Sequence, residues 1–154
     1  MTAINIVRDS LRDNLNDPYV LAGGSTRSGS MWIFSDEQIA SGKFPQVQLL
    51  KIDNPSQVLD IGPTYTEYEQ LFINVWFRTK NGFKITVGGT EYTNAQLVEY
   101  YLGLIKTTLK SQFSTLFDLG AKGYVHVNTT NPDYDADTQT YYGAVTIRVF
   151  YFNT

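Results

Sequence analysis

The chain has 154 residues, the size of one domain, so we expect residues 1–154 to form a single unit. Hydrophobic residues make up 42% and charged residues 18%, a balance that argues against wholesale disorder. A net charge of −3 with scattered Lys and Arg offers no basic patch for nucleic acid. The lack of cysteine excludes disulfides, thiolate zinc sites and cysteine nucleophiles. We expect neither a signal peptide nor a membrane span, because no suitable apolar run occurs.

The first segment, Thr2–Asn16, has the spacing of an amphipathic helix. Its apolar residues recur every three or four positions and share one face: Ile4, Val7, Leu11 and Leu15. Thr2 is the expected N-cap. Asn16-Asp17-Pro18 should end the helix, because the residue before a proline avoids the helical region.

The next segments are a loop and two strands. Leu21–Ser30 is rich in Gly and Ser but lacks the Gly-Lys-Ser/Thr signature of a phosphate-binding loop. Strands are predicted at Met31–Phe34 and Phe44–Ile52, with one helical turn opening at Ser35–Gln38 between them. The connection Asp53–Pro63 contains Asn-Pro and Gly-Pro turn signals.

Tyr65–Thr79 is the longest predicted strand. From residue 69 onward its odd-numbered positions are mostly apolar: Leu71, Ile73, Val75 and Phe77. Strand side chains alternate between faces, so this set predicts a face for the core. Phe72 and Trp76 stand among polar residues on the second face. That pattern is expected where another subunit covers a sheet, or where a helix or loop of the same chain does.

A hairpin and a long helix follow. Asn81-Gly82 predicts a type I′ turn, with Phe83–Val87 as the return strand and Gly88-Gly89 as a further turn. Thr93–Phe117 has a helical stripe that should lie on the apolar face of the long strand. The stripe is Val98, Tyr101, Leu102, Ile105, Leu109, Phe113 and Leu116.

The C-terminal region reads as a terminal β-hairpin. Tyr124–Thr129 and Tyr142–Phe152 are its strands, joined by the polar segment Thr130–Tyr141. The whole order predicts an α+β fold: a mainly antiparallel sheet, with an N-terminal helix and one long helix packed on one face.

Few residues suggest chemistry. Asp133, Asp135 and Asp137 match the first half of a calcium loop, but Thr138 and Ala144 stand where an EF-hand has Gly and Glu. His126 is the single histidine and has no predictable partner. The serines at 25, 28 and 30 lack a nucleophile-elbow motif. We therefore expect no catalytic residues, no cofactor and no metal site, and hence no enzyme.

The order of elements resembles that of tail terminator (tail completion) proteins of long-tailed bacteriophages and related viruses. The matching segment is Phe44–Ile52, F-P-Q-V-Q-L-L-K-I, followed by a polar connection with Gly62 and the strand end Ile73–Phe77, I-N-V-W-F. The N-terminal helix, the Gly-containing loop, the long helix and the terminal hairpin extend the resemblance over most of the chain. The acidic tip Asp133–Asp137 falls outside that pattern.

The resemblance implies a structural virion protein of the tail or neck, assembled in the host cytoplasm. Copies would form a ring, usually of six, that caps the tail tube, stops its polymerisation and meets the neck or head connector. DNA would pass through the lumen without specific binding, which the acidic excess suits through like-charge repulsion. A ring needs head-to-tail contacts between two different patches. The candidate interface residues are Phe72, Trp76, Arg78, Phe150 and Phe152.

Three loops are candidate contacts to the rings above and below: Leu21–Ser30, Asp53–Pro63 and Pro132–Gln139. Two alternatives remain open at this point. The chain is another neck or tail component, such as a head-closure or tube protein. Otherwise it is a calcium- or ligand-binding module that uses the acidic tip.

Overall fold

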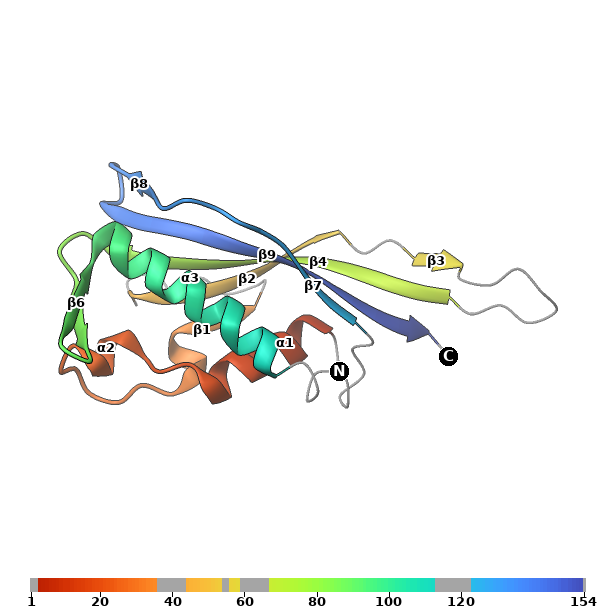
Figure 1. Cartoon of the computed structure of the whole chain (residues 1–154), viewed down its shortest axis with the longest axis horizontal. Coiled ribbons are helices and arrows are strands. Elements are labelled where there is room, and N and C mark those ends of the chain that lie inside the picture. Colours follow the sequence, from red (N-terminus) through yellow and green to blue (C-terminus); the bar gives the residue numbers. More distant parts are fainter. Residues whose placement is uncertain (1–2, 36–43, 54–55, 59–66, 113–122, 154) are drawn as a thin grey trace.

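The fold is a seven-stranded sheet whose helices lie on one side (Figure 1). The computed structural model describes residues 3–35, 44–53, 56–58, 67–112 and 123–153. The main strand order is β1-β2-β4-β9-β7, and β3 and β8 are short additions beside β4 and β9. All described pairs are antiparallel except β1 with β2. The predicted α+β class is therefore confirmed.

The two longest strands form the centre of the sheet. β4 (Glu67–Lys80) and β9 (Thr140–Asn153) pair antiparallel along their full length, from Glu67 opposite Asn153 to Lys80 opposite Thr140. The other edge of β4 pairs with β2 (Gln46–Asp53) and then with β3 (Ser56–Val58). β4 thus has neighbours on both sides. Figure 1 shows the β3 end of this sheet running past the helices.

The predicted return strand after Asn81-Gly82 is wrong. β5 (Lys84–Val87) pairs with β6 (Thr90–Thr93) in a separate two-stranded sheet, joined by the predicted Gly88-Gly89 turn. β5 does not return along β4 because β2 and β9 already occupy both edges of that strand. The turn type also differs. Of its two central residues only Gly82 has a positive φ, of 86°, which fits a type II turn rather than type I′.

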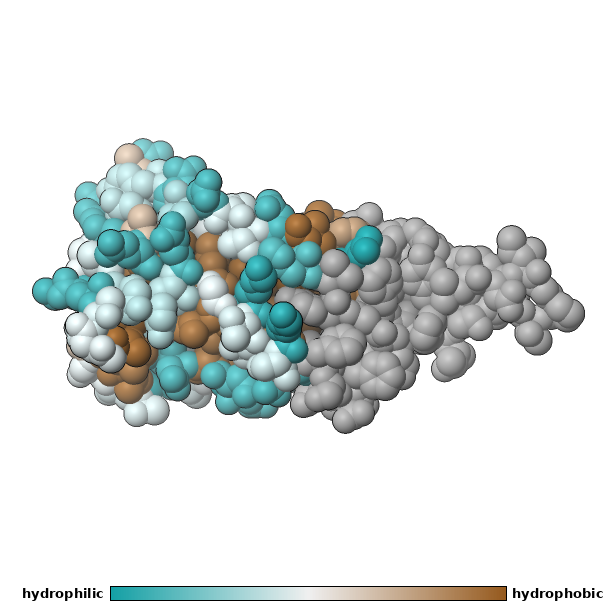
Figure 2. Space-filling view, in the orientation of Figure 1, coloured by the Kyte–Doolittle hydropathy of each residue, from teal (hydrophilic) through white to brown (hydrophobic). Residues whose placement is uncertain are grey.

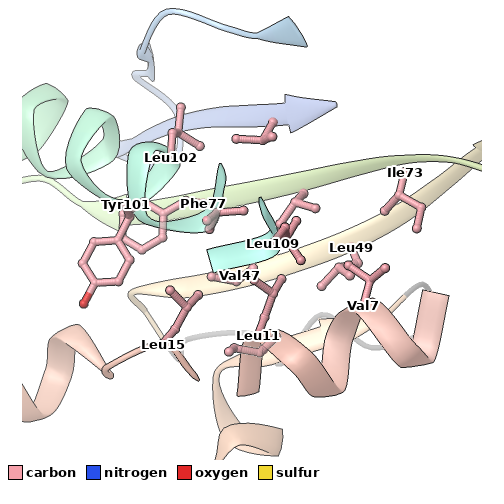
Figure 3. Packing of buried hydrophobic residues seen from close by; sticks show 14 of the residues in the cluster. Val7, Leu11, Leu15, Val47, Leu49, Ile73, Phe77, Tyr101, Leu102 and Leu109 are labelled. Carbon is pink, nitrogen blue, oxygen red and sulfur yellow. The ribbon is translucent and has the colours of Figure 1, made fainter. Parts of the chain in front are cut away.

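Two helices cover the apolar face of the sheet, as their spacing predicts. α1 (Ala3–Asn14) and α3 (Asn94–Ser111) bury one stripe each against the odd-numbered residues of β4. Figure 3 shows this core, in which Leu11 and Tyr101 approach Phe77 and Val47 from the two helices. The Phe77 and Tyr101 rings stack with centroids 4.6 Å apart. The core positions include Val7, Leu49, Ile73, Val75, Leu102, Ile105, Leu109, Val145, Ile147 and Val149.

The N-terminal connection has more structure than its composition suggests. Pro18 begins a short helix, α2 (Pro18–Leu21), and Asp17 caps it by accepting a hydrogen bond from the Tyr19 backbone N–H. A 3₁₀ turn, η1 (Gly29–Met31), then leads into β1 (Ile33–Ser35), which pairs with β2. The strand predicted at Met31–Phe34 is therefore present, shifted toward the C-terminus.

The terminal β-hairpin is confirmed: β7 (Gly123–Thr129) pairs with β9. The segment predicted as a polar turn also contains β8 (Asp133–Asp135), which pairs with the start of β9. Three expectations lie largely outside the described residues. The helical turn predicted at Ser35–Gln38 is described only at Ser35, which belongs to β1. The helical positions predicted at 113–117, beyond the end of α3 at Ser111, and most of the connection Asp53–Pro63 are not described. Among the helices that the structure describes, none has the length and apolar character needed to cross a membrane.

Candidate functional site

The even-numbered positions of β4 form the second face of the sheet, opposite the core. From residue 72 to residue 78 every odd-numbered residue is buried and every even-numbered one is half-buried. The alternation follows from the pleat, because the core side chains of α1 and α3 pack against one face alone. The described helices pack on the core face and not on the second face (Figure 1).

Trp76 and Arg78 form the centre of this face. The Arg78 guanidinium lies 5.5 Å from the centre of the Trp76 ring, within cation–π range. Arg78 Nη1 also donates a hydrogen bond of 2.5 Å to Gln48 Oε1 on β2. Tyr142 of β9 stands opposite Arg78, and its ring lies 5.9 Å from that of Trp76. One Arg and one Trp of β4 therefore meet one Tyr of the adjacent strand β9.

A nearby cross-strand pair also places an arginine over an aromatic ring. Phe72 is opposite Arg148, whose guanidinium lies 5.9 Å from the ring centre. Between this pair and the Trp76 cluster Thr146 Oγ1 donates a hydrogen bond of 2.6 Å to Asn74 Oδ1. We call Phe72, Trp76, Arg78, Tyr142 and Arg148 the aromatic–arginine face. The first three are sequence candidates, and the cross-strand register adds the other two.

The electrostatics of this face follow from partial burial. Burial lowers the pKa of the Arg78 guanidinium below its ordinary value, and Tyr142 acts against that shift. The Asp133 carboxylate raises the pKa of the Tyr142 phenol above its ordinary value of 10.0, and burial acts in the same direction. The phenol is therefore held protonated and donates a hydrogen bond of 3.3 Å to Asp133 Oδ2.

The face is partly closed within the chain itself. Gln46 and Gln48 on β2 are 2% and 4% exposed, and Ala144 beside Trp76 is 2% exposed. The side chains of the aromatic–arginine face are themselves half-buried. The burial of Gln46, Gln48 and Ala144 shows that part of this face is already covered within the chain, whereas Trp76 and Arg78 keep some exposed surface for a further contact.

The other two candidate interface residues lie farther along β9. Phe150 pairs with Gln70 and Phe152 with Tyr68 in the β4–β9 ladder. Their side chains lie outside the described residues, so their interface role stays a prediction.

The acidic tip Asp133–Asp137 is partly a strand. Asp133 and Asp135 lie in β8 instead of a loop, paired with Tyr142 and Thr140. Asp135 Oδ1 accepts a hydrogen bond from the Asp137 backbone N–H. Across the described ranges no three His, Cys, Asp or Glu side chains are grouped as metal ligands.

The remaining polar candidates are not brought together. His126 Nε2 lies 2.6 Å from Thr129 Oγ1 on the same strand. Burial lowers the pKa of His126, and nearby Lys106 acts in the same direction. The Ser28 and Ser30 hydroxyls hydrogen-bond to each other at 2.9 Å.

Seven large apolar side chains of the described residues are exposed, and three of them, Tyr19, Val20 and Leu21, are consecutive on α2. Figure 2 shows small separate hydrophobic areas among polar ones in this view, one of them over α2, where Val20 and Leu21 are exposed. A few such residues are normal on a soluble surface.

Comparisons with known proteins give a likeness in structure and none in sequence. No protein-family model matches the chain, and no curated protein matches it in sequence. A solved structure described as the virion of a native gene transfer agent particle contains a similar chain, with 10% identity and a TM-score of 0.41. The match covers 96% of this chain and 92% of that one. At that identity and TM-score the likeness carries no argument about function.

Proposed function

We propose that the chain is a structural virion protein whose copies form a ring at the end of the tail tube. The ring, of six copies as the sequence resemblance implies, stops tube polymerisation and joins the tube to the neck or head connector. It is a tail or neck component, assembled in the host cytoplasm, and has no catalytic activity.

The aromatic–arginine face is the observation that carries this proposal. Trp, Tyr and Arg are the residue types most enriched where binding energy concentrates at protein interfaces. Here one residue of each type meets on adjacent strands, half-buried and on the side away from the described helices. Sheet strands hold these side chains in place, so little conformational entropy is lost when a neighbour covers them.

The position of the face suits a ring. A closed ring of identical subunits joins one patch to a different patch on the next copy. The aromatic–arginine face lies on one side of the sheet and the helices lie on the other. One subunit can therefore contact one neighbour through the sheet side and a second neighbour through the helix side.

The loops supply the contacts along the tail axis in this proposal. The segments at 21–30 and 132–139 face other rings, namely the tail tube protein on one side and the neck or head-connector protein on the other. DNA passes through the lumen without specific binding, which the net charge of −3 favours.

Electron microscopy of particles assembled without this protein tests the role. We expect overlong tails without heads, because nothing then halts the tube. Supplying the wild-type chain should restore tails of uniform length with heads. Tails of normal length that lack heads would instead indicate a head-closure protein, and normal complete particles would refute a tail or neck role.

A further inference from the structure

A groove lies between β6 and the first turns of α3. Its volume is about 360 Å³, and its lining is Thr90, Glu91, Tyr92, Gln96, Glu99 and Tyr100. Figure 1 shows β6 beside the start of α3 at one end of the molecule. The groove belongs to the helix layer, so it is separate from the aromatic–arginine face.

Two stacked tyrosines form the wall of the groove. The rings of Tyr92 and Tyr100 lie 4.2 Å apart at 19° to each other. Tyr100 meets Tyr101 edge-on at 5.7 Å, and Tyr101 stacks on Phe77 in the core. A continuous chain of ring contacts thus joins the groove to the core. The wall is held in place before any ligand binds, which reduces the entropy lost on binding.

Two carboxylates stand beside this wall. Glu91 and Glu99 are exposed, and neither carboxylate makes an ion pair or a hydrogen bond with another described residue. Among the described residues that line the groove, none is Lys, Arg or His. Aromatic faces attract cations, and carboxylates accept hydrogen bonds from a guanidinium. The groove is therefore complementary to a positively charged side chain.

The chain itself is a poor source of that side chain. Every arginine in the chain contacts a partner of its own within the chain: Arg8 with Asp9, Arg12 with the Ile33 carbonyl, Arg27 with Asp17, Arg78 with Gln48 and Arg148 with Phe72. An arginine from a second copy would have to leave such a contact. Arginine matches planar acceptors and aromatic faces better than lysine does.

We propose that this groove docks an arginine-bearing segment of a different protein. The guanidinium lies over the outward tyrosine ring and donates hydrogen bonds to the carboxylates of Glu91 and Glu99. This contact is independent of the ring contact proposed above, so either one can fail without the other.

The test uses the full chain and a peptide probe with one arginine among uncharged residues. NMR signals of the Tyr92 and Tyr100 rings should shift saturably as this peptide is added. The same peptide with citrulline, which keeps the shape but loses the charge, should bind at least about tenfold more weakly, since losing a charged hydrogen bond costs that much. The double variant Glu91→Gln and Glu99→Gln should lose affinity to the same degree. Asp13→Asn, which removes an exposed carboxylate of α1 away from the groove, should bind as the wild type does.

Equal binding of the arginine and citrulline peptides would overturn the proposal, as would unchanged binding by the glutamine variant or no shifts at all. Shifts of the same tyrosine signals on raising the protein concentration without peptide, abolished in the glutamine variant, would assign the groove to a second copy instead. None of these outcomes changes the expectation for particles that lack the protein.

Discussion

Asp17 and Arg27 form a buried ion pair that ties the Gly-rich loop to the first turn of α2. Arg27 Nε donates to Asp17 Oδ2 at 2.7 Å, and Arg27 Nη2 donates to Oδ1. Both side chains are 8% exposed. Arg27 also donates a hydrogen bond of 3.1 Å to the Pro45 carbonyl, just before β2. One guanidinium therefore links the loop, α2 and the sheet.

Removing either partner should be costly. Arg27→Met leaves the Asp17 carboxylate buried and uncompensated, which typically costs about 3–5 kcal/mol in unfolding free energy. Urea denaturation measures the loss. The double variant with Asp17→Asn should lose less than the sum of the two single losses, because no unpaired charge remains. A cost below about 1 kcal/mol for Arg27→Met would mean that the pair behaves as a surface ion pair.

Gly143 marks the closest approach of α3 to the sheet. A Cβ built there would lie 2.7 Å from Leu102 Cδ1 and 3.0 Å from Val98 Cγ1, both on α3. Gly143→Ala therefore overpacks the core, and we expect it to destabilise the fold by about 1–3 kcal/mol. A combined Leu102→Val change, which shortens the clashing side chain, should recover part of the loss. Unchanged stability of Gly143→Ala would show that the helix shifts freely on the sheet.

Gly103 provides the opposite case in the same helix. It is exposed on α3, and a Cβ added there meets nothing within 4 Å. Gly103→Ala should raise the unfolding free energy by about 0.5–1 kcal/mol, because alanine loses less backbone entropy in a helix. Thermal unfolding of Gly103→Ala and Gly143→Ala, measured in parallel, should show a gain in stability for the first variant and a loss for the second. A destabilised Gly103→Ala variant would indicate that this side of α3 is covered.

Tyr101 should make stability fall at high pH. Burial raises the pKa of its phenol above the ordinary value of 10.0, and Asp17 adds to that shift. The hydroxyl donates a hydrogen bond of 2.6 Å to the Asn16 carbonyl. In the unfolded chain the phenol ionises above pH about 10, whereas the folded state keeps its proton, so stability is lost as pH rises past that value.

Tyr101→Phe isolates this effect. At pH 7 the variant should lose about 1 kcal/mol with the hydrogen bond. Between pH 9 and pH 11, values chosen to span about one unit on each side of the free phenol's pKa, its stability should fall less than that of the wild type. Urea midpoints at the two pH values give the comparison. Equal decline in both proteins would show that Tyr101 does not contribute.

The sequence predicts the elements whose burial is periodic. Apolar residues recur with a helical period in α1 and α3 and with a period of two in β4. These periods can be read within each segment alone, and they show which residues face the common core. They were enough to place Phe72, Trp76 and Arg78 on the second face of the sheet.

The sequence does not predict what depends on pairing between distant strands. The return strand predicted after Asn81-Gly82 does not pair with β4, because β9, much later in the sequence, occupies the edge that it would use. Tyr142 and Arg148 join the aromatic–arginine face only through the register of β9 with β4. The strands β3 and β8 have 3 residues each, too few for a period to be visible.

The groove between β6 and α3 is likewise not predictable from the sequence, for a related reason. Its residues come from β6 and α3, and neither segment has an unusual composition alone. The available signal was the pair Tyr92 and Tyr100 on either side of the expected helix start. That spacing becomes a ring stack only once β6 turns back beside the helix.

The assembly state of the Trp76→Ala variant tests the central claim most directly. Sedimentation of the wild type should show a closed oligomer with the mass of a ring, whereas Trp76→Ala should sediment as a folded monomer. Val127→Ser, which removes an exposed apolar side chain of β7, is the matched control and should assemble as the wild type does. A wild type that stays monomeric at every concentration, or a Trp76→Ala variant that forms the same ring, would contradict the account.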